Sequence, residues 1–369
     1  MNLLARLRPR SPAASVDLAD PKVALDPFPH YEELRRLGPV HFLPVHGWWI
    51  VLGYDEVKAA FARPDLFSSR AQTALDAVML GVDPPDHAPV RRLASRLFAS
   101  EALDRIEARA QALAGELLRP ELELVGGFAR PISTAAAADV LGLDDEDLAA
   151  FLHAAGRDGG GAIPFMETIP LIQGVAHRAK PFQRFMAEAE PSLSEEQARS
   201  LVTIIWLAAI DTTERLIANS ALRLIEDGTM FGRIKAEPAL LRPFLAEVTR
   251  LNPSEHLVPR IALAPARIGG VEIPAGATVQ LCVSAANRDP AQFERPAELW
   301  LERPPAKNFC FGHGVHQCIG GPLARRVVAA AIDTLIRRST DLRPLQPLDR
   351  IQFHGSPTSL GPSHMLVGL

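Results

Sequence analysis

The segment from Phe311 to Gly320 has the sequence Phe-Gly-His-Gly-Val-His-Gln-Cys-Ile-Gly and gathers a thiol, two histidines and several glycines beside an aromatic ring. A helix is predicted directly after it, from Pro322 to Arg338. A thiolate near a helix N-terminus is stabilised by the unpaired amide groups and by the positive end of the helix dipole. Cys318 is therefore a candidate nucleophile or metal ligand.

The surroundings of Cys318 leave four interpretations open. It can be a buried structural cysteine, which is the usual role of a single thiol, or a catalytic nucleophile with His316 as its base. It can be a zinc ligand, although no second cysteine lies two to four residues away. It can also be the one axial thiolate of a haem iron, in which case Gly314 and Gly320 would let the backbone approach a flat group and Phe311 would cover the sulfur.

A second candidate site lies inside a long predicted helix. Ser194 and Gln197 have the spacing of a capping box, and a helix follows to about Glu226. Its middle is apolar nearly all round, so it must run through the core, and an acid beside a threonine, Asp211-Thr212, is unexpected there. The ordinary explanation is a polar pair in which the threonine bonds back to the preceding turn.

Two other predicted helices carry charged side chains at helical spacing. His87 and Arg91 are four residues apart, so they share one face and could hold an anion, or could simply belong to a solvated basic face. Glu247 and Arg250 are three residues apart, and such a pair is most often a surface pair that contributes little.

The composition is that of a folded protein with a large buried core. The chain has 369 residues, of which 47% are hydrophobic and 22% charged, and its net charge of −4 argues against a nucleic-acid partner. Its three cysteines, Cys282, Cys310 and Cys318, are too few and too scattered for a disulfide framework and fit a reducing compartment. The N-terminal residues contain no long apolar run, so we expect no signal peptide, no membrane anchor and a cytoplasmic location.

The pattern Phe311-x-x-Gly314-x-x-x-Cys318-x-Gly320 resembles the haem-binding loop of the cytochrome P-450 family. The extra histidine two residues before the cysteine, His316, is typical of the bacterial, soluble branch of that family. The resemblance favours the axial-thiolate interpretation of Cys318.

Three further segments resemble other parts of the same family, in the same order. Residues 208–213, Ala-Ala-Ile-Asp-Thr-Thr, resemble its oxygen-activation motif, with Ala209 in the usual glycine position. His87 and Arg91 resemble a pair that holds a haem propionate. The segment Glu247-x-x-Arg250, followed by Pro259-Arg260 and by Ala286 to Pro290, resembles the Glu-x-x-Arg helix and the meander of the family.

This resemblance spans about Pro27 to Leu369 and implies a mainly α, helix-rich triangular fold, one domain with small β-sheets. Residues 1–26 would be an N-terminal extension and residues 27–369 the haem domain. Phe151 to Ser194 would form a lid over the substrate that is shorter than the family's pattern, and Ile351 to Leu369 a closing hairpin.

The resemblance also implies a set of site residues around haem b, iron protoporphyrin IX. Cys318 would be the axial ligand of the haem iron, and Asp211 and Thr212 would deliver protons during oxygen activation. A buried ion triad behind the haem would consist of Glu247, Arg250 and Arg303. The other cofactor-binding residues would be His87, Arg91, Arg260, Phe311, His316 and Gly320, and the substrate pocket would be lined by Ile205, Ala208, Ala209, Val258 and Leu360.

The implied activity is that of a haem-thiolate monooxygenase, which inserts one oxygen atom of O₂ into a small hydrophobic organic substrate. Because no flavin or iron–sulfur segment is evident in the chain, electrons are expected from a ferredoxin and its NAD(P)H-dependent ferredoxin reductase. The ferredoxin is predicted to dock on a basic face made by Arg92, Arg96, Arg325 and Arg326.

Two alternatives to this activity stay open. A peroxide-driven haem-thiolate peroxygenase would not need the pair Asp211-Thr212, which is present. A haem protein with a non-catalytic role, such as ligand sensing, would need neither that pair nor an electron-donor face.

Overall fold

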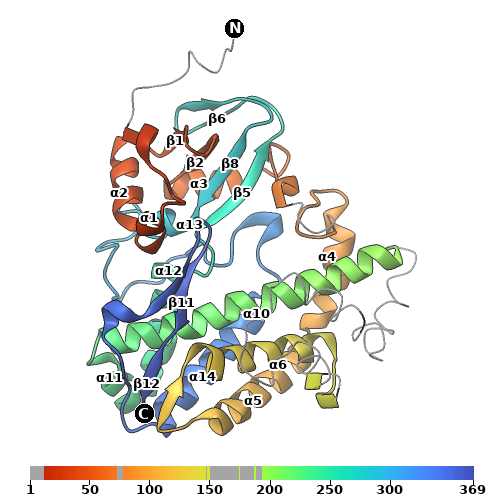
Figure 1. Cartoon of the computed structure of the whole chain (residues 1–369). Coiled ribbons are helices and arrows are strands. Elements are labelled where there is room, and N and C mark those ends of the chain that lie inside the picture. Colours follow the sequence, from red (N-terminus) through yellow and green to blue (C-terminus); the bar gives the residue numbers. More distant parts are fainter. Residues whose placement is uncertain (1–11, 73–77, 147, 150–173, 175–186, 188–192) are drawn as a thin grey trace. The chain divides into compact units, whose positions relative to one another are not determined.

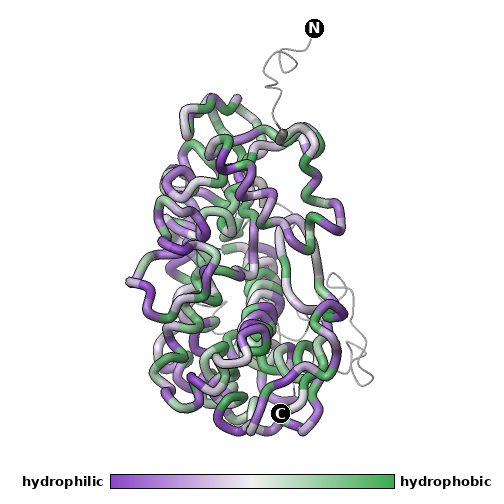
Figure 2. The backbone as a smooth tube through the Cα atoms, turned by 90° about the vertical axis from the view of Figure 1, so that its left-hand side faces the viewer, coloured by the Kyte–Doolittle hydropathy of each residue, from purple (hydrophilic) through white to green (hydrophobic). Residues whose placement is uncertain are grey.

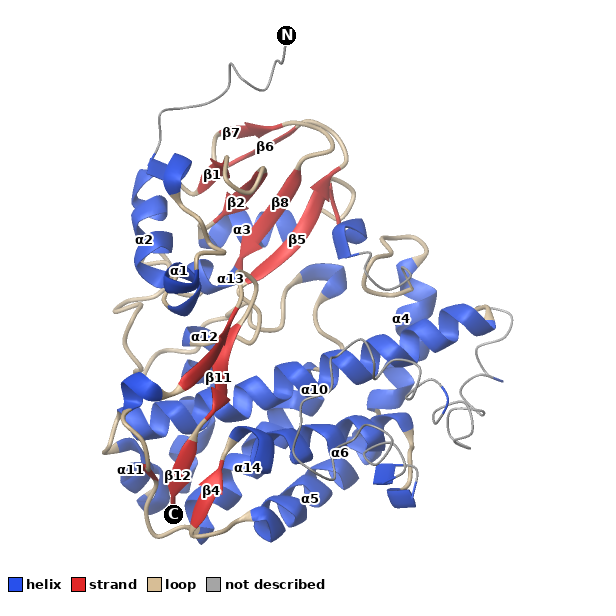
Figure 3. Ribbon diagram, in the orientation of Figure 1, coloured by secondary structure: helices blue, strands red, loops and turns tan. Residues whose placement is uncertain are grey.

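The structure is a computed structural model that describes the whole chain except residues 1–11, 73–77, 147, 150–173, 175–186 and 188–192 (Figure 1). The described residues form many helices and several small β-sheets (Figure 3), which confirms the mainly α fold that the sequence predicts. The predicted lid, Phe151 to Ser194, lies almost wholly outside the described residues.

The described chain divides into two compact units. Unit one comprises residues 1–73, 246–318 and 353–361, and unit two comprises residues 74–245, 319–352 and 362–369. The helix α12 (Leu241–Leu251) begins in unit two and ends in unit one. The predicted division into an extension, residues 1–26, and a haem domain, residues 27–369, stays a prediction.

Unit one is built on a five-stranded sheet with the strand order β1-β2-β8-β5-β3. The strands β2 and β8 are parallel, and the other neighbours are antiparallel. The strands β1 and β2 form an antiparallel hairpin around Gly47, and β3 is a two-residue strand that is too short to show an alternating sequence pattern. The strands are β1 (Val40–Leu43), β2 (Trp48–Val51), β3 (Phe67–Ser68), β5 (Leu257–Ala262) and β8 (Thr278–Cys282).

The short helices of unit one complete two apolar clusters with this sheet. Tyr31 and Leu34 pack with Leu43, and the same cluster includes Ala13 and Leu18. Part of the predicted N-terminal extension, residues 1–26, is therefore packed in the core of the unit. The remaining elements are η2 (Pro12–Ser15), α1 (Pro21–Leu25), α2 (Phe28–Leu37), α3 (Tyr54–Phe61), η3 (Ser69–Gln72), the strand pair β6 (Ala266–Ile268) and β7 (Val271–Ile273), α13 (Val283–Ala286) and η9 (Gly314–His316).

Unit two is organised around the 32-residue helix α10 (Glu195–Glu226), which the sequence predicts with nearly the same bounds. The predicted capping box forms: Gln197 N donates to Ser194 Oγ (3.1 Å), and Ser194 N donates to Gln197 Oε1 (2.9 Å). The helices α6 and α14 pack against α10, and α5 packs against α6 and α14 (Figure 1).

The other elements of unit two are helices and one small sheet. The helix α6 ends at Gly142, which has the left-handed conformation (φ +68°) typical of a residue just after a helix. The elements are α4 (His87–Ser95), η4 (Arg96–Phe98), α5 (Ser100–Leu117), η5 (Val125–Ala129), α6 (Arg130–Leu141), α11 (Met230–Ala236), η8 (Pro238–Leu240), α14 (Gly321–Arg338), η10 (Leu348–Arg350) and a sheet of β4 (Glu121–Glu123), β12 (Leu366–Gly368) and β9 (Arg343–Pro344).

The C-terminal segment contains the predicted closing hairpin. The strands β10 (Gln352–Gly355) and β11 (Leu360–His364) form a two-stranded sheet. Thr358 O, at the tip, accepts a hydrogen bond from His256 N (2.5 Å), so in unit one the hairpin tip lies beside the residues that lead into β5.

Polar and apolar residues alternate along most of the chain rather than gathering in one long apolar segment (Figure 2). Among the described residues, no helix has both the length and the apolar character needed to cross a membrane.

Candidate functional site

The segment before Cys318 forms a compact loop that is closed by its own backbone hydrogen bonds. Gly312 N donates to Phe309 O (2.9 Å), Gln317 N to Gly314 O (3.1 Å), and Cys318 N to Phe311 O (2.8 Å). These bonds fold the segment back on itself and leave the side chain of Cys318 exposed. Cys318 is therefore not the buried structural cysteine that was one of its possible roles.

Two glycines give the loop its shape. Gly314 has a φ of +74°, and a Cβ atom there would lie 2.5 Å from Phe61 O, so the loop can approach α3 this closely only with glycine. Gly312 also has a positive φ, of +65°. Gly320 has a φ of −79°, which other residues also adopt, and it serves as the N-cap of α14.

An aromatic cluster in unit one connects this loop to Arg260. Phe309, in the loop, stacks on Tyr54 with ring centroids 4.6 Å apart and also packs against Phe61. The guanidinium of Arg260 lies over the Phe61 ring, 5.4 Å from its centroid, and donates to Pro259 O (2.8 Å). Arg260 is buried, so the structure fixes a cation and the Cys318 loop against the same ring.

The three residues of the predicted ion triad are in contact in unit one. Glu247 accepts hydrogen bonds from Arg250 Nε and Nη2, both at 2.8 Å, and from Arg303 Nε at 3.0 Å. Burial alone would raise the pKa of Glu247, but the hydrogen bonds from Arg250, Trp300 N and Arg303 outweigh it, and the pKa is lowered. Glu247 and Arg250 are not the surface pair that their spacing alone would suggest, since both side chains are buried.

The two arginines of this triad also hold the segment that leads to the loop. Arg250 donates to the carbonyl oxygens of Asn287 (3.0 Å), Pro296 (2.6 Å) and Glu298 (2.9 Å). Asn287 Oδ1 in turn accepts from Phe309 N (2.7 Å). The triad therefore fixes the backbone on which the Cys318 loop begins.

In unit two, the middle of α10 contains a partly exposed window. Residues 201–207 are buried, but Ala208 is exposed and residues 209–212 are half-buried. The side chain of Asp211 is 38% exposed, so the expectation of a buried acid at this place is wrong. Thr212 Oγ1 donates to Ala208 O (2.6 Å), the back-bond to the preceding turn that was the ordinary explanation for this threonine.

Asp211 belongs to a cluster of charges that sequence reasoning missed. Arg215 Nη2 donates to Asp211 Oδ2 (2.5 Å). Next to them, Glu214 forms a two-pronged ion pair with Arg130, the first residue of α6. The sequence did contain a signal for this cluster, because the charged residues Glu214 and Arg215 follow Asp211 in a helix that is predicted to run through the core.

His87 and Arg91 lie on one face of α4, as their spacing predicts. His87 begins the helix and is buried, and its backbone N donates to Asp83 O (3.2 Å). Burial, and secondarily the charge of Arg91, lower the pKa of His87, so its imidazole is neutral near pH 7.

The remaining predicted residues are divided between the two units. Unit one contains Phe311 and His316, both half-buried, and Gly320 lies in unit two. Among the predicted pocket residues, Val258 and Leu360 belong to unit one, where Val258 packs partly on the core. The others belong to α10: Ile205 is buried, Ala209 half-buried and Ala208 exposed.

The predicted basic docking face stays a prediction. One of its four arginines, Arg326, pairs with Asp104 and also with Glu107 (3.2 Å), so its charge is partly compensated. Arg92 and Arg325 are exposed.

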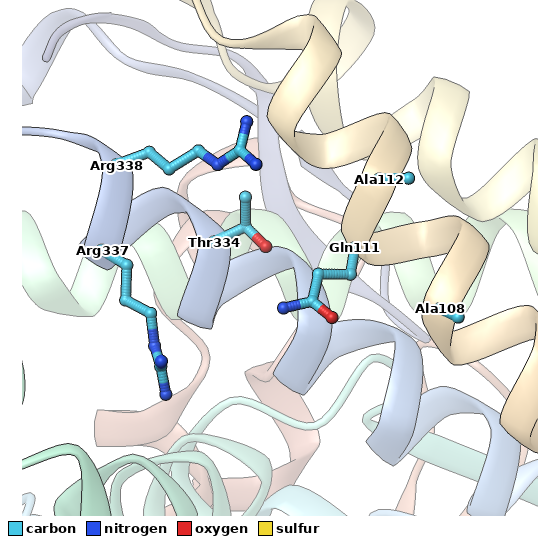
Figure 4. A pocket seen from close by; sticks show the side chains of 6 residues that line it. All are labelled: Ala108, Gln111, Ala112, Thr334, Arg337 and Arg338. Carbon is cyan, nitrogen blue, oxygen red and sulfur yellow. The ribbon is translucent and has the colours of Figure 1, made fainter.

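A surface pocket of about 280 Å³ lies between α5 and α14, apart from the residues discussed so far (Figure 4). Arg337 pairs with Asp333 (2.8 Å), and the guanidinium of Arg338 lies against Gly115, where a Cβ atom would be 2.5 Å away. None of the predicted site residues lines this pocket, whose walls are Ala108, Gln111, Ala112, Thr334, Arg337 and Arg338.

Comparison with known proteins identifies the class to which this arrangement belongs. The sequence profile described as Cytochrome P-450 matches residues 178–340. Cytochrome P-450 CYP107DY1 of Priestia megaterium is 30% identical over 301 residues, which cover 75% of this chain and 73% of that protein. The monooxygenase PikC of Streptomyces venezuelae is 28% identical, over 86% of this chain and 85% of that one.

Solved structures agree with these sequence relatives. The substrate-free cytochrome P-450 CYP150A6 of Mycobacterium marinum has a TM-score of 0.86 at 25% identity, over 96% of this chain and 98% of that one. CYP109E1 of Bacillus megaterium, solved in complex with testosterone, has a TM-score of 0.81 at 25% identity, over 94% and 98%. The chain belongs to the cytochrome P-450 family; it is a monooxygenase that binds haem and uses O₂.

The side chains present fit such a group. A haem iron of this family takes one thiolate, and Cys318 is an exposed thiol on a loop whose path is fixed. Among the residues that the structure describes, no three His, Cys, Asp or Glu side chains are gathered so that they could hold a metal ion, so the zinc alternative for Cys318 has no ligand set there.

Proposed function

We propose that Cys318 is the axial ligand of the haem iron and that the enzyme oxidises small hydrophobic substrates with electrons from a ferredoxin. The observation that carries the proposal is the loop from Phe309 to Cys318, which presents an exposed thiol and is held against α3 by a glycine that no other residue can replace without strain. When bound, the haem supplies the binding and activation of O₂, and a thiolate ligand favours O–O cleavage.

The charged residues around the site are proposed to hold the two propionates. Arg260 is a buried cation on the same aromatic cluster as the loop, and Arg91 is a second cation on α4. His87 and His316 would donate hydrogen bonds to carboxylate oxygens. Phe311 and Gly320 complete the cofactor-binding set, Phe311 by excluding water from the sulfur.

Asp211 and Thr212 are proposed to move protons toward the oxygen-binding side. A hydroxyl both donates and accepts, so Thr212 Oγ1 can pass on a proton and be resupplied. The carboxylate of Asp211, which is partly exposed, can exchange protons with water and pass them inward. This partial exposure supports a relay better than a fully buried acid would.

A hydrophobic substrate is supported by the apolar side chains proposed to line the pocket: Ile205, Ala208, Ala209, Val258 and Leu360. Testosterone, the ligand in the CYP109E1 structure, is a rigid apolar probe of suitable class. We expect it or a similar compound to shift the Soret band of the ferric protein from low to high spin. A screen in which only polar compounds produce the shift would overturn the substrate class.

The electron source separates the monooxygenase from its two alternatives. Product should form with NADPH, a bacterial ferredoxin and a ferredoxin reductase, because the Asp211-Thr212 pair is present for proton delivery. Turnover with hydrogen peroxide alone would instead indicate a peroxygenase. Ligand binding without turnover under either condition would indicate a sensor.

A further inference from the structure

Four charged side chains of unit two form a connected cluster around Asp211. Arg130 donates through Nε and Nη2 to the two carboxylate oxygens of Glu214, with Nη2 and Oε1 2.6 Å apart. Arg215 donates through Nη2 to Asp211 Oδ2 (2.5 Å). Three of the four come from one stretch of α10, and Arg130 comes from α6.

Glu214 is the member of the cluster that depends most on its partner. Its side chain is 3% exposed, whereas that of Asp211 is 38% exposed and can be solvated. Burial raises the pKa of Glu214, the hydrogen bonds and charge of Arg130 oppose this rise, and the charge of Asp211 adds to it. A carboxylate in this position needs a cation, because an unpaired buried charge is strongly unfavourable.

The place of Arg130 is set by the turn that precedes α6. Glu123 accepts hydrogen bonds from the backbone N atoms of Val125 (3.1 Å) and Gly127 (3.1 Å), and Ala129 N closes the turn on Leu124 O (2.9 Å). The charge of Glu123 also acts on Arg130. The hydrogen bonds of this turn therefore hold Arg130 in the position where it contacts Glu214.

We propose that Arg130, by neutralising Glu214, is a positioning residue that keeps Arg215 paired with Asp211. Two acids of α10 lie within the electrostatic reach of Arg215, and only one of them is hydrogen-bonded to it. If Arg130 is removed, the buried Glu214 competes for Arg215, and the more exposed Asp211 is the acid that can give it up. The cluster would therefore set the direction of the Asp211 carboxylate, an inference that rests on the relay proposed above.

The test is Arg130→Met in the full-length, haem-loaded protein. A crystal structure should show Arg215 hydrogen-bonded to Glu214 instead of Asp211. With NADPH, ferredoxin and reductase, the fraction of electrons released as hydrogen peroxide should rise, and the rate in deuterium oxide relative to water should change. We expect an effect of about tenfold on coupled turnover, below the roughly 10²–10⁴-fold contribution of a complete proton-transfer group.

The double variant Arg130→Met, Glu214→Met separates charge balance from packing. It removes Glu214, which would compete for Arg215, together with Arg130. Arg215 should therefore pair with Asp211 again, and the peroxide fraction and the isotope effect should return toward those of the parent. A merely structural role for Arg130 predicts no such recovery. If Arg130→Met does not fold, Arg130→Gln, which keeps a hydrogen-bond donor without the charge, should show the same re-pairing.

Two control variants show whether an effect is specific to Arg130 and whether Asp211 takes part in proton transfer. Arg109→Met removes an arginine that pairs with Asp139 at the other end of α6, and it should leave the isotope effect unchanged. Asp211→Asn tests the relay itself. The inference about Arg130 is overturned if Asp211→Asn alters coupling while Arg130→Met leaves both the Arg215–Asp211 pair and the isotope effect unchanged. If Asp211→Asn changes neither coupling nor the isotope effect, the proposed relay is wrong, and the inference that rests on it is wrong as well.

Discussion

At the scale of single residues, Glu247 is a buried group whose removal should be costly. It is the acceptor for two arginines and the backbone N of Trp300, and Arg250 beside it is 2% exposed. Glu247→Gln keeps the shape but leaves the cation of Arg250 without its counter-charge. We expect a loss of about 3–5 kcal/mol in the free energy of unfolding, measured by chemical denaturation.

A matched control is available in the same unit. Glu298 also pairs with an arginine, Arg295, at 3.4 Å, but its side chain is 59% exposed. Glu298→Gln should cost less than about 1 kcal/mol. Equal effects of the two substitutions would contradict the view that the Glu247 pair is buried and structural.

The lowered pKa of Glu247 predicts a pH dependence of the same stability. The folded state favours the ionised carboxylate, so its contribution is fully present above the ordinary glutamate pKa and is lost as the pH falls through the lower, folded-state value. The difference in unfolding free energy between parent and Glu247→Gln should therefore shrink on acidification below about pH 4.5. A difference that grows instead in this range would show that the sign is wrong.

Thr212 is the second residue with a specific expected phenotype. Thr212→Ala should keep the haem content of the parent and release more hydrogen peroxide per NADPH, because the hydroxyl that passes protons is gone. Thr203→Ala is its control, since Thr203 makes the same kind of bond to the preceding turn of α10, to Arg199 O at 2.9 Å. Equal peroxide release from Thr212→Ala and the parent would remove Thr212 from the relay.

At the scale of elements, the loop before Cys318 depends on its contact with α3. Gly314→Ala adds a Cβ atom 2.5 Å from Phe61 O at a φ of +74°. Gly47→Ala imposes a similar φ, +71°, with nothing within 4 Å, so it isolates the backbone strain from the collision. We expect Gly47→Ala to cost about 1–3 kcal/mol, and Gly314→Ala to cost more and to lower the haem content.

These two variants are compared by denaturation and by the absorbance ratio of haem to protein. Equal stability losses, with full haem content in both, would mean that the loop can move away from α3 without consequence.

The helix α10 combines a packing role with a chemical one. Its first turn is exposed but capped by Ser194, residues 201–207 and 216–222 are buried, and residues 208–212 between them form a partly exposed stretch. A helix that is buried on both sides of this stretch can present Asp211 and Thr212 in a fixed direction, as positioning of a proton-transfer group requires.

At the scale of the whole molecule, the sequence predicted what depends on local patterns. The bounds of α10 follow from its capping box and apolar stretch, and the loop before Cys318 from its glycine spacing. The triad of Glu247, Arg250 and Arg303 was predicted only through the family resemblance, because an acid and an arginine three residues apart are usually exposed.

What the sequence did not show depends on partners far away in the chain. The pairing of Arg326 with Asp104 and of Glu214 with Arg130 joins residues separated by 222 and 84 positions, and charge spacing along one helix holds no information about them. The partial exposure of Asp211 was missed for the same reason, since it depends on which neighbours leave α10 uncovered.

Cys318 is proposed to bind the haem iron, and the spectrum of the reduced carbon monoxide complex tests this assignment most directly. The parent should show the red-shifted Soret band of a thiolate-bound haem. Cys318→Ala should lose that band, whereas Cys310→Ala, which changes the other cysteine of the same loop, should keep it. A red-shifted band that survives in Cys318→Ala, or disappears in Cys310→Ala, would contradict the assignment.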